Sequence, residues 1–207
     1  MAYVLRHNPT RYGLQPDRHG YVDIERFLAV AGERHGGITL SHVRGLVEDR
    51  RGSERFELSD RGLRARYGHS IPVEPLGPPI EPPPRLYHGT EAACAGSILI
   101  DGLTPMSRRM VHLSGSVEDA VGVARRKIER PVVWCVRARD AASTGLAFYR
   151  EGRLYLTTRV PARFLERLEP SAPPACAAHS TPLRAASRAE PKDAVGTADK
   201  QPPADEP

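Results

Sequence analysis

Two short segments place a histidine beside glycine or small hydroxyl residues in stretches otherwise typical of β-strands. They are Tyr87-His88-Gly89-Thr90 and Val111-His112-Leu113-Ser114. Between them lie a helical stretch ending at Asp101-Gly102-Leu103 and the cations Arg108 and Arg109. Two polar strand edges that face one groove, with guanidinium groups at its rim, would suit a flat polar ring and a diphosphate. The pattern therefore points towards NAD.

A second chemical signal is the tripeptide Leu5-Arg6-His7 near the N-terminus. Imidazole titrates near neutrality, so His7 could act as a general acid or contact a phosphate. Taken alone, the tripeptide is explained more simply as an exposed pair on a short helix. The three cysteines, Cys94, Cys135 and Cys176, show no metal-ligand spacing. We predict no metal site and a reducing, cytoplasmic environment.

The composition favours an anionic partner. The chain has 207 residues, with 30 Lys and Arg against 25 Asp and Glu, and Arg predominates among the cations. A basic, Arg-rich chain favours nucleic acid as its partner, although codon bias would also explain the arginines. No apolar run approaches membrane-spanning length. We expect a monomer that does not associate with membranes.

The first 70 residues read as helices followed by a hairpin. A short helical piece ends near Asn8-Pro9, and Tyr21-Val22 resembles a short strand. Asp23 is a candidate cap for one helix, and Thr39 or Ser41 for the next. The stretch from Arg55 to Leu58 alternates like a strand, Asp60-Arg61-Gly62 reads as a turn, and Leu63 begins the return strand. This order predicts a winged-helix-like lobe over residues 1–70, a form that often binds nucleic acid.

A proline-rich linker separates this lobe from a second one. Residues 71–84 contain seven prolines in fourteen positions, which favours extended, semi-rigid geometry. Residues 85–170 read as a β-rich lobe with two short helices. Strands are expected at 85–87, 111–113, 131–136 and 154–157, with helices over 91–100 and from Ser116. There is no glycine-rich strand–turn–helix fingerprint, which argues against a Rossmann domain. The predicted class is α+β.

The last stretch, residues 171–207, is rich in alanine and proline and has no aromatic residue. Such a composition buries too little apolar surface to offset the entropy of ordering. We predict a disordered tail.

The order and spacing of several short motifs resemble those of one known family. In the first lobe they are Leu5-Arg6-His7-x-Pro9, Gly13-Leu14, Asp17-x-x-Gly20-Tyr21-Val22, Arg55-Phe56, Arg64-Ala65 and Gly68-His69-Ser70-Ile71-Pro72. In the second they are Tyr87-His88-Gly89-Thr90, Gly102-Leu103, Met106-x-Arg108, Val111-His112-Leu113-Ser114, Phe148-Tyr149, Leu156-Thr157 and Val160-Pro161. Each motif is weak by itself, but together they resemble the RNA 2′-phosphotransferases, the Tpt1/KptA proteins, over about residues 3–168.

The resemblance implies a two-step reaction that consumes NAD and uses no metal. An RNA 2′-phosphate attacks C1″ of the nicotinamide ribose and expels nicotinamide. The 2″-hydroxyl of ADP-ribose then attacks phosphorus, which leaves a 2′-hydroxyl RNA and ADP-ribose 1″,2″-cyclic phosphate. The implied partner is an RNA with an internal 2′-phosphate, such as spliced tRNA.

The family's catalytic set corresponds here to Arg6, His7, Arg55 and Arg108. The first three would orient the RNA phosphate, Arg108 would face them from the NAD lobe, and His7 would serve the transesterification step. For Arg55 a solvent-facing strand residue is the alternative. Because Arg64 and His69 lie in family motifs, we also expect them to contact the substrate phosphate.

The second lobe resembles the ADP-ribosyltransferase fold. The resemblance implies that His88, Gly89 and Thr90 hold the nicotinamide and its ribose, with His112 and Ser114 on the second strand. Related transferases usually carry a catalytic Glu on a third strand, near Leu154 of this chain, and no carboxylate stands there. A phosphate dianion is already a nucleophile, whereas a neutral hydroxyl needs a base. The missing Glu therefore argues for a phosphate acceptor.

The sequence leaves two alternative functions open. One is ADP-ribosylation of terminal phosphates of nucleic acids, which stops after the first step. The other is a winged-helix nucleic-acid binder joined to an inactive NAD lobe. The presence of Arg6, His7, Arg108, His88 and His112 argues against the second.

Overall fold

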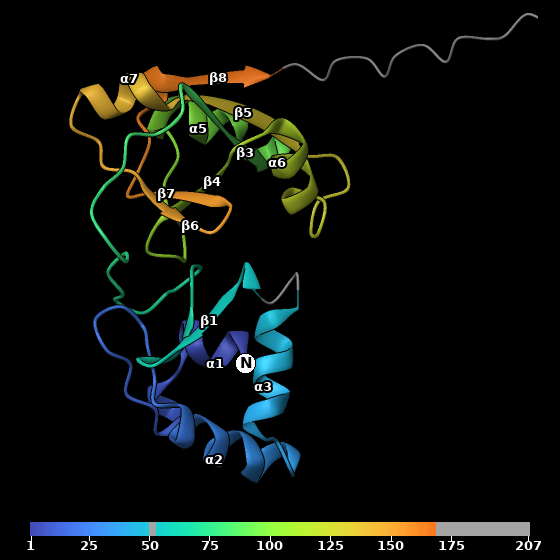
Figure 1. Ribbon diagram of the computed structural model, residues 1–207. Helices are drawn as coiled ribbons and strands as arrows, with labels where there is room; N and C mark the ends of the chain where they lie inside the picture. The colour runs from blue at the N-terminus through green and yellow to red at the C-terminus, as the bar shows by residue number, and fades with distance from the viewer. Residues whose placement is uncertain (50–52, 169–207) are drawn as a thin grey trace, which may run out of the picture. The chain divides into compact units, whose positions relative to one another are not determined.

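The computed structural model describes residues 1–49 and 53–168, and its helices and strands confirm the predicted α+β class (Figure 1). The expected tail, residues 171–207, lies outside the described residues. Residues 1–170 form one compact unit with two separate hydrophobic cores. We refer to residues 1–70 as the N lobe and residues 85–168 as the C lobe. Their likeness to a winged helix and to an ADP-ribosyltransferase stays a prediction.

The N lobe contains three α-helices, a short 3-10 helix and a β-hairpin among its described residues. The elements are α1 (Ala2–His7), η1 (Thr10–Tyr12), α2 (Ile24–His35), α3 (Leu40–Glu48), β1 (Phe56–Ser59) and β2 (Gly62–Ala65). The predicted caps are confirmed, because the Asp23 side chain accepts from the N–H of Arg26 and the Thr39 side chain from that of His42. Thr39, rather than Ser41, caps α3.

The hairpin closes onto the segment before α2. Strands β1 and β2 pair from Phe56 opposite Ala65 to Ser59 opposite Gly62, as the sequence predicted. Val22 forms an isolated bridge to Leu63, so the expected strand at residues 21–22 is reduced to one bridge. Gly62 has φ of 113°, and a Cβ there would lie 2.2 Å from the carbonyl oxygen of Val22, so the position requires glycine.

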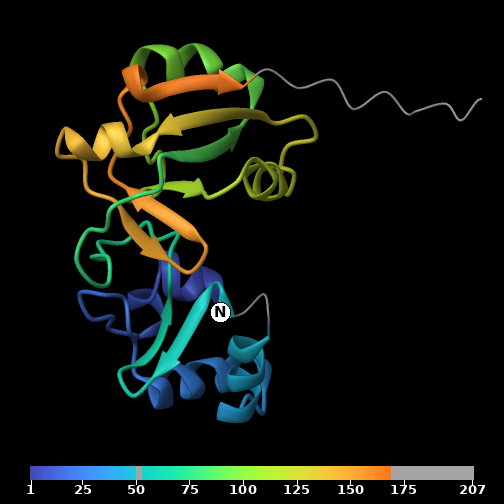
Figure 2. The ribbon, with the colours of Figure 1, turned by 45° about the horizontal axis from the view of Figure 1, so that its top comes forward.

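The C lobe is built on a six-stranded sheet in the order β6-β7-β4-β3-β5-β8 (Figure 2). Its strands are β3 (Arg85–Thr90), β4 (Val111–Ser114), β5 (Val132–Arg137), β6 (Tyr149–Glu151), β7 (Leu154–Thr157) and β8 (Leu165–Leu168). Its helices are η2 (Ala92–Cys94), α5 (Ala95–Asp101), α6 (Val117–Ala124), α7 (Ala138–Ser143) and η3 (Ala162–Phe164). Every neighbouring pair is antiparallel, which agrees with the exclusion of a Rossmann domain.

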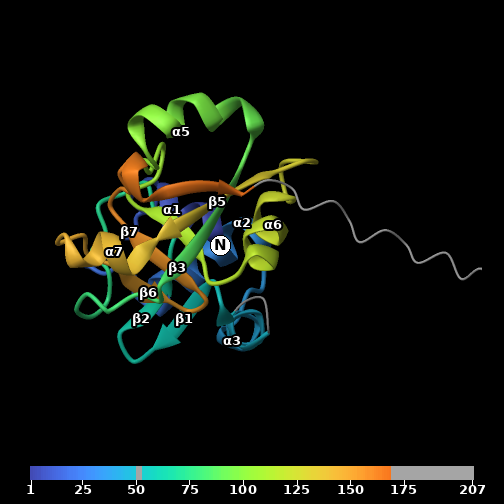
Figure 3. The ribbon, with the colours of Figure 1, turned by 90° about the horizontal axis from the view of Figure 1, so that it is seen from above.

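Helices cover both faces of this sheet. Helix α5 packs Ile98 into the core that contains Leu86 and Trp134. Helix α6 lies on the other side of these strands, where Gly89 of β3 meets it (Figure 3). A Cβ at Gly89 would lie 2.7 Å from the carbonyl oxygen of Ala120, so this close approach depends on glycine.

The sheet opens between β3 and β4. Strand β3 pairs with β5 along its whole length, from Arg85 to Thr90, but with β4 only through Tyr87 and Ser114. Beyond that pair the two strands that carry the histidine motifs separate. The groove between two polar strand edges that the sequence suggested would lie at this separation, and it stays a prediction.

Residues 71–84 are attached to both lobes. The N–H of Glu74 donates to the carbonyl of Arg18 (2.8 Å), and the N–H of Ile80 donates to the carbonyl of Phe148 (2.7 Å). These bonds hold the proline-rich segment along the two lobes. None of the described helices has the length and apolar character needed to cross a membrane.

Candidate active site

The end of α1 is held by the segment that follows β2. The N–H of Ser70 donates to the carbonyl of Arg6 (3.0 Å), and Ser70 Oγ lies 3.0 Å from Nδ1 of His7. Gly68 has φ of 87°, and its missing Cβ leaves room for the Arg6 side chain, which would lie 3.4 Å away. Two motifs more than sixty residues apart thus fix Arg6 and His7.

Arg6 is a half-buried cation that forms no ion pair with another described residue. Its guanidinium lies 5.1 Å from the ring centroid of Tyr67. Nε and Nη2 are buried and have no hydrogen-bond partner among the described residues. Burial, followed by the charges of Arg55 and Arg108, lowers the pKa of Arg6. An anion placed here would relieve both the desolvation and the repulsion.

The four predicted catalytic residues are brought close enough to affect one another. Burial, followed by the charges of Arg6 and Arg108, lowers the pKa of His7. Arg108 is exposed on the loop between α5 and β4, while Arg55 directly precedes β1. Among the described residues, no ion pair involves Arg6, His7, Arg55 or Arg108. Cations from both lobes therefore converge on a site without a carboxylate partner.

The hydrogen bonds of His88 and His112 define their tautomers. His88 Nδ1 lies 3.0 Å from the carbonyl oxygen of His112, and because a carbonyl only accepts, Nδ1 carries the proton. Its Nε2 is left as an acceptor. Nη1 of Arg108 lies 3.4 Å from Nδ1 of His112, and because guanidinium only donates, His112 carries its proton on Nε2. That Nε2 is buried without a partner among the described residues.

Both rings are neutral at pH 7. Burial, followed by the charges of Arg108 and Arg6, lowers the pKa of His112 to about 3. Burial also lowers the pKa of His88, against the opposing effect of its hydrogen bond to His112. His88 and His112 therefore offer one neutral acceptor and one neutral donor, which suits hydroxyl and amide groups.

The other expected NAD contacts lie on the same strands. Gly89 and Thr90 end β3 where it leaves β4, and Ser114 is buried at the end of β4. Ser114 pairs with Tyr87 on one side and with Leu154 on the other. Leu154, near which the resemblance places the Glu of related transferases, thus lies opposite Ser114.

Two expected phosphate contacts have different surroundings. Arg64 is 1% exposed and donates to Glu57 (2.8 Å) and Glu151 (3.0 Å), so its charge is already compensated. The structure places Arg64 in an ion pair with both carboxylates, and its expected contact with the substrate phosphate stays a prediction. His69 is also buried, with Nε2 directed at Gly20, and burial followed by the charge of Arg6 lowers its pKa to about 4.

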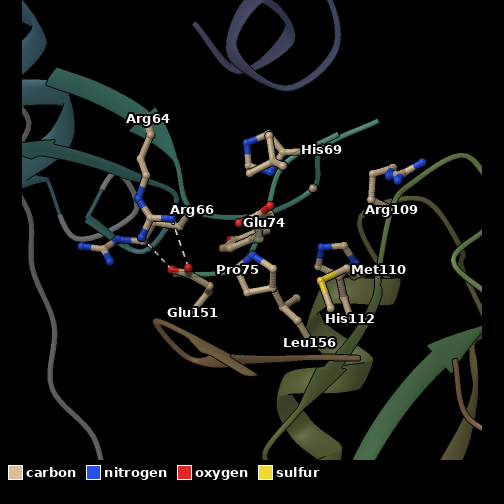
Figure 4. A pocket seen from close by; sticks show the side chains of 13 residues that line it. Arg64, Arg66, His69, Glu74, Pro75, Arg109, Met110, His112, Glu151 and Leu156 are labelled. Carbon is tan, nitrogen blue, oxygen red and sulfur yellow. Dashed lines mark hydrogen bonds and ion pairs between the residues drawn. The ribbon is translucent and has the colours of Figure 1, made fainter. Parts of the chain in front are cut away.

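His69 instead connects the lobes through its backbone. Its carbonyl accepts from the N–H of Arg109 (2.9 Å), and both residues line a pocket that also includes His112 and Glu151 (Figure 4). The Nε2 of His69 is buried without a partner among the described residues, and its expected contact with the substrate phosphate stays a prediction.

Tyr67 was missed as a site residue. Its ring lies beside the Arg6 guanidinium and meets His112 edge-on, with ring centroids 5.8 Å apart. The only signal in the sequence is an aromatic residue between Arg66 and the Gly68 motif. Among residues 1–49 and 53–168, no three His, Cys, Asp or Glu side chains are grouped to hold a metal ion.

The comparison with known families decides the relationship. Residues 1–160 match the model of the RNA 2′-phosphotransferase, Tpt1/KptA family. The chain belongs to this family. The match includes the N lobe, the C lobe as far as residue 160, and every motif at which the convergent cations, His88 and His112 lie.

Similar proteins come from bacteria and archaea. The chain is 38% identical over 169 residues to a probable RNA 2′-phosphotransferase of Lacticaseibacillus paracasei, covering 81% of this chain and 90% of that one. It is 37% identical over 167 residues to a protein of the same description from Acetivibrio thermocellus, covering 80% and 92%. A Pyrococcus horikoshii protein so described is 37% identical over 154 residues, covering 74% and 86%.

Proposed function

We propose that this protein is an NAD-dependent RNA 2′-phosphotransferase that removes an internal 2′-phosphate, as on spliced tRNA. The observation that carries the proposal is the half-buried, uncompensated Arg6, whose Nε and Nη2 are buried without a hydrogen-bond partner and which lies among His7, Arg55 and Arg108. Such a set suits a doubly charged phosphate better than any neutral acceptor. Family membership supports the same substrate.

NAD is assigned to the groove between β3 and β4. The acceptor Nε2 of His88 suits a ribose hydroxyl, and the donor Nε2 of His112 suits an oxygen of the ribose or the phosphate. Gly89 and Thr90 would hold the nicotinamide through their backbone groups, with Ser114 beside them. Arg108 donates to His112 and lies near Arg6, so it stands where NAD and RNA phosphate would meet.

In the first step an oxygen of the RNA 2′-phosphate attacks C1″ of the nicotinamide ribose. The bond from C1″ to the ring nitrogen breaks, and nicotinamide leaves with the electron pair. The attacking dianion brings its own charge, which agrees with Leu154 opposite Ser114 where a carboxylate would otherwise activate a hydroxyl. Arg6 and Arg55 hold the phosphate in line with C1″.

In the second step the 2″-hydroxyl of ADP-ribose attacks phosphorus. The hydroxyl loses its proton, the bond from phosphorus to the RNA 2′-oxygen breaks, and that oxygen takes up a proton. The products are 2′-hydroxyl RNA and ADP-ribose 1″,2″-cyclic phosphate. We assign the proton donation to His7, whose Nδ1 is held by Ser70. Arg108 and Arg6 stabilise the charge that develops at phosphorus.

The test compares two matched RNAs in the presence of NAD. One carries an internal 2′-phosphate and the other a 5′-terminal phosphate. We expect nicotinamide release and loss of phosphate from the first RNA, with formation of the cyclic phosphate. Stable ADP-ribosylation of the 5′-phosphate, without turnover of the internal 2′-phosphate, would overturn the proposal in favour of terminal ADP-ribosylation. Binding of RNA without nicotinamide release would favour an inactive binder.

A further inference from the structure

The hairpin of β6 and β7 is attached to the N lobe by a buried ion pair. Arg64 of β2 donates through Nη1 and Nη2 to the two carboxylate oxygens of Glu151 at the end of β6, at 3.1 and 3.0 Å. The two residues are 1% and 3% exposed. Figure 4 shows them in direct contact at one side of the pocket that His69 and His112 also line.

Arg64 is held equally firmly on its own side. Its Nε and Nη2 donate to Glu57, its cross-strand neighbour in the β1–β2 hairpin, at 3.0 and 2.8 Å. Burial by itself would lower the pKa of Arg64, but the hydrogen bonds and charges of Glu151 and Glu57 raise it. The guanidinium is therefore fixed on two sides and has one conformation in which all these bonds form.

A second ion pair attaches the same hairpin beside the candidate phosphate site. Arg153, in the turn between β6 and β7, contacts Glu54 at 2.8 Å. Glu54 is the residue before Arg55, which is expected to bind phosphate. The turn residue Gly152 lies so close that a Cβ there would be 3.5 Å from the carbonyl oxygen of Glu54. The turn therefore contacts the backbone that carries Arg55.

The other strand of the hairpin leads to the groove. Strand β7 pairs with β4 over its length, with Leu156 opposite His112 and Leu154 opposite Ser114. The hairpin thus connects Arg55 and β2 of the N lobe to the strand that carries His112 and Ser114.

We propose that the β6–β7 hairpin, through Glu151–Arg64 and Arg153–Glu54, positions the phosphate-binding cations of the N lobe against the NAD groove of the C lobe. Glu151 and Arg64 are positioning residues in this account. A buried ion pair adds little stability over an apolar pair of similar size, but its bidentate geometry fixes an orientation. The inference rests on the proposed function, because it assumes that the two reactants lie on different lobes.

Because NAD and the RNA phosphate would bind to different lobes, the proposal predicts different effects on kcat and on the KM for NAD. NAD would bind to the C lobe alone, so loosening the hairpin should leave its affinity unchanged. The attack of phosphate on C1″ needs the two lobes in the correct relative position, because a displacement of about 1 Å can lower the rate about a hundredfold. Loss of the ion pair should therefore lower kcat without raising the KM for NAD.

The test uses Glu151→Gln, which keeps the shape of the side chain and removes its charge. Wild-type protein and variant are assayed with NAD and an RNA carrying an internal 2′-phosphate, and NAD binding is measured separately by calorimetry without RNA. We expect kcat to fall at least tenfold, with the Kd for NAD unchanged within twofold. The matched control is Glu166→Gln, because Glu166 forms an exposed ion pair with Arg137 inside the C lobe at 3.5 Å. The control should retain wild-type kcat.

Two results would overturn the inference while wild-type protein turns over. One is wild-type kcat in Glu151→Gln, and the other is a loss of NAD affinity as large as the loss of kcat. If Glu151→Gln does not fold, Arg153→Gln at the more exposed ion pair serves instead. It should lower kcat severalfold with an unchanged Kd for NAD, and wild-type kcat there counts against the inference. An inactive wild-type protein would refute the proposed function itself.

Discussion

Replacing Gly89 by alanine should disturb the groove through packing rather than through chemistry. The added methyl would lie 2.7 Å from both the carbonyl oxygen of Ala120 and the Cβ of Ala124. That is about 0.7 Å inside the shortest ordinary van der Waals contact, so β3 and α6 must move apart. Because β3 also carries His88 and Thr90, their displacement should weaken NAD binding.

The expected cost follows from the overpacking. An extra methyl in a closely packed site costs about 1–3 kcal/mol. For a chain of this length each kcal/mol lowers Tm by about 2–4 °C, so Tm should fall by about 2–12 °C. The KM for NAD should rise in the same variant.

The matched control lies on the same helix. Gly122 of α6 is exposed, and a Cβ there would meet nothing within 4 Å. Gly122→Ala should therefore raise the free energy of unfolding by about 0.5–1 kcal/mol through better helix propensity, without changing the KM for NAD. Thermal denaturation and steady-state kinetics on both variants provide the measurement. If Gly89→Ala matches wild type in Tm and in KM, the account of β3 and α6 is refuted.

Three further predictions concern the cations and histidines. His7→Ala should accumulate ADP-ribosylated RNA, which gel mobility detects, and unimpaired release of 2′-hydroxyl RNA would contradict its assigned role. Arg108→Ala should lose both steps, with nicotinamide release at least a hundredfold slower, and wild-type turnover would remove it from the site. Because the pKa of His112 is about 3 in the folded protein and about 6.5 when unfolded, the unfolded chain binds more protons between these values. The free energy of unfolding should therefore fall as pH drops below about 6.5, and His112 should account for up to about 1.4 kcal/mol of this fall per pH unit. Urea unfolding at pH 7.5, 6.5 and 5.5 gives the free energy of unfolding at each pH. This free energy should fall less steeply with decreasing pH in His112→Asn than in wild type, and an equal fall in both proteins would contradict the assignment.

Local signals in the sequence were enough to predict many of the elements. Asp23, Thr39 and Ser116 each cap the helix that was expected to follow them, because capping depends on a few neighbouring residues. The hairpin around Asp60 and Arg61 was equally local. Helix α7 and strands β6 and β8 were missed, since they are short and their burial depends on the sheet beside them.

The ion pair of Arg64 could not be found from its motif. Its partner Glu151 lies 87 positions away in the sequence, so only the folded chain brings the two together. The convergence of Arg6 with Arg108 was expected from the family resemblance rather than from periodicity. The separation of β3 from β4 beyond Tyr87 likewise depends on strand pairing, which no single strand pattern reveals.

The central claim is that phosphate leaves RNA by transfer to NAD rather than to water. The most direct measurement labels the internal 2′-phosphate of an RNA with ³²P, adds protein and NAD, and identifies the labelled product by chromatography. The account predicts that the label appears in ADP-ribose 1″,2″-cyclic phosphate, one per nicotinamide released, and stays on RNA when NAD is omitted. Label in inorganic phosphate, or release of label without NAD, would contradict it.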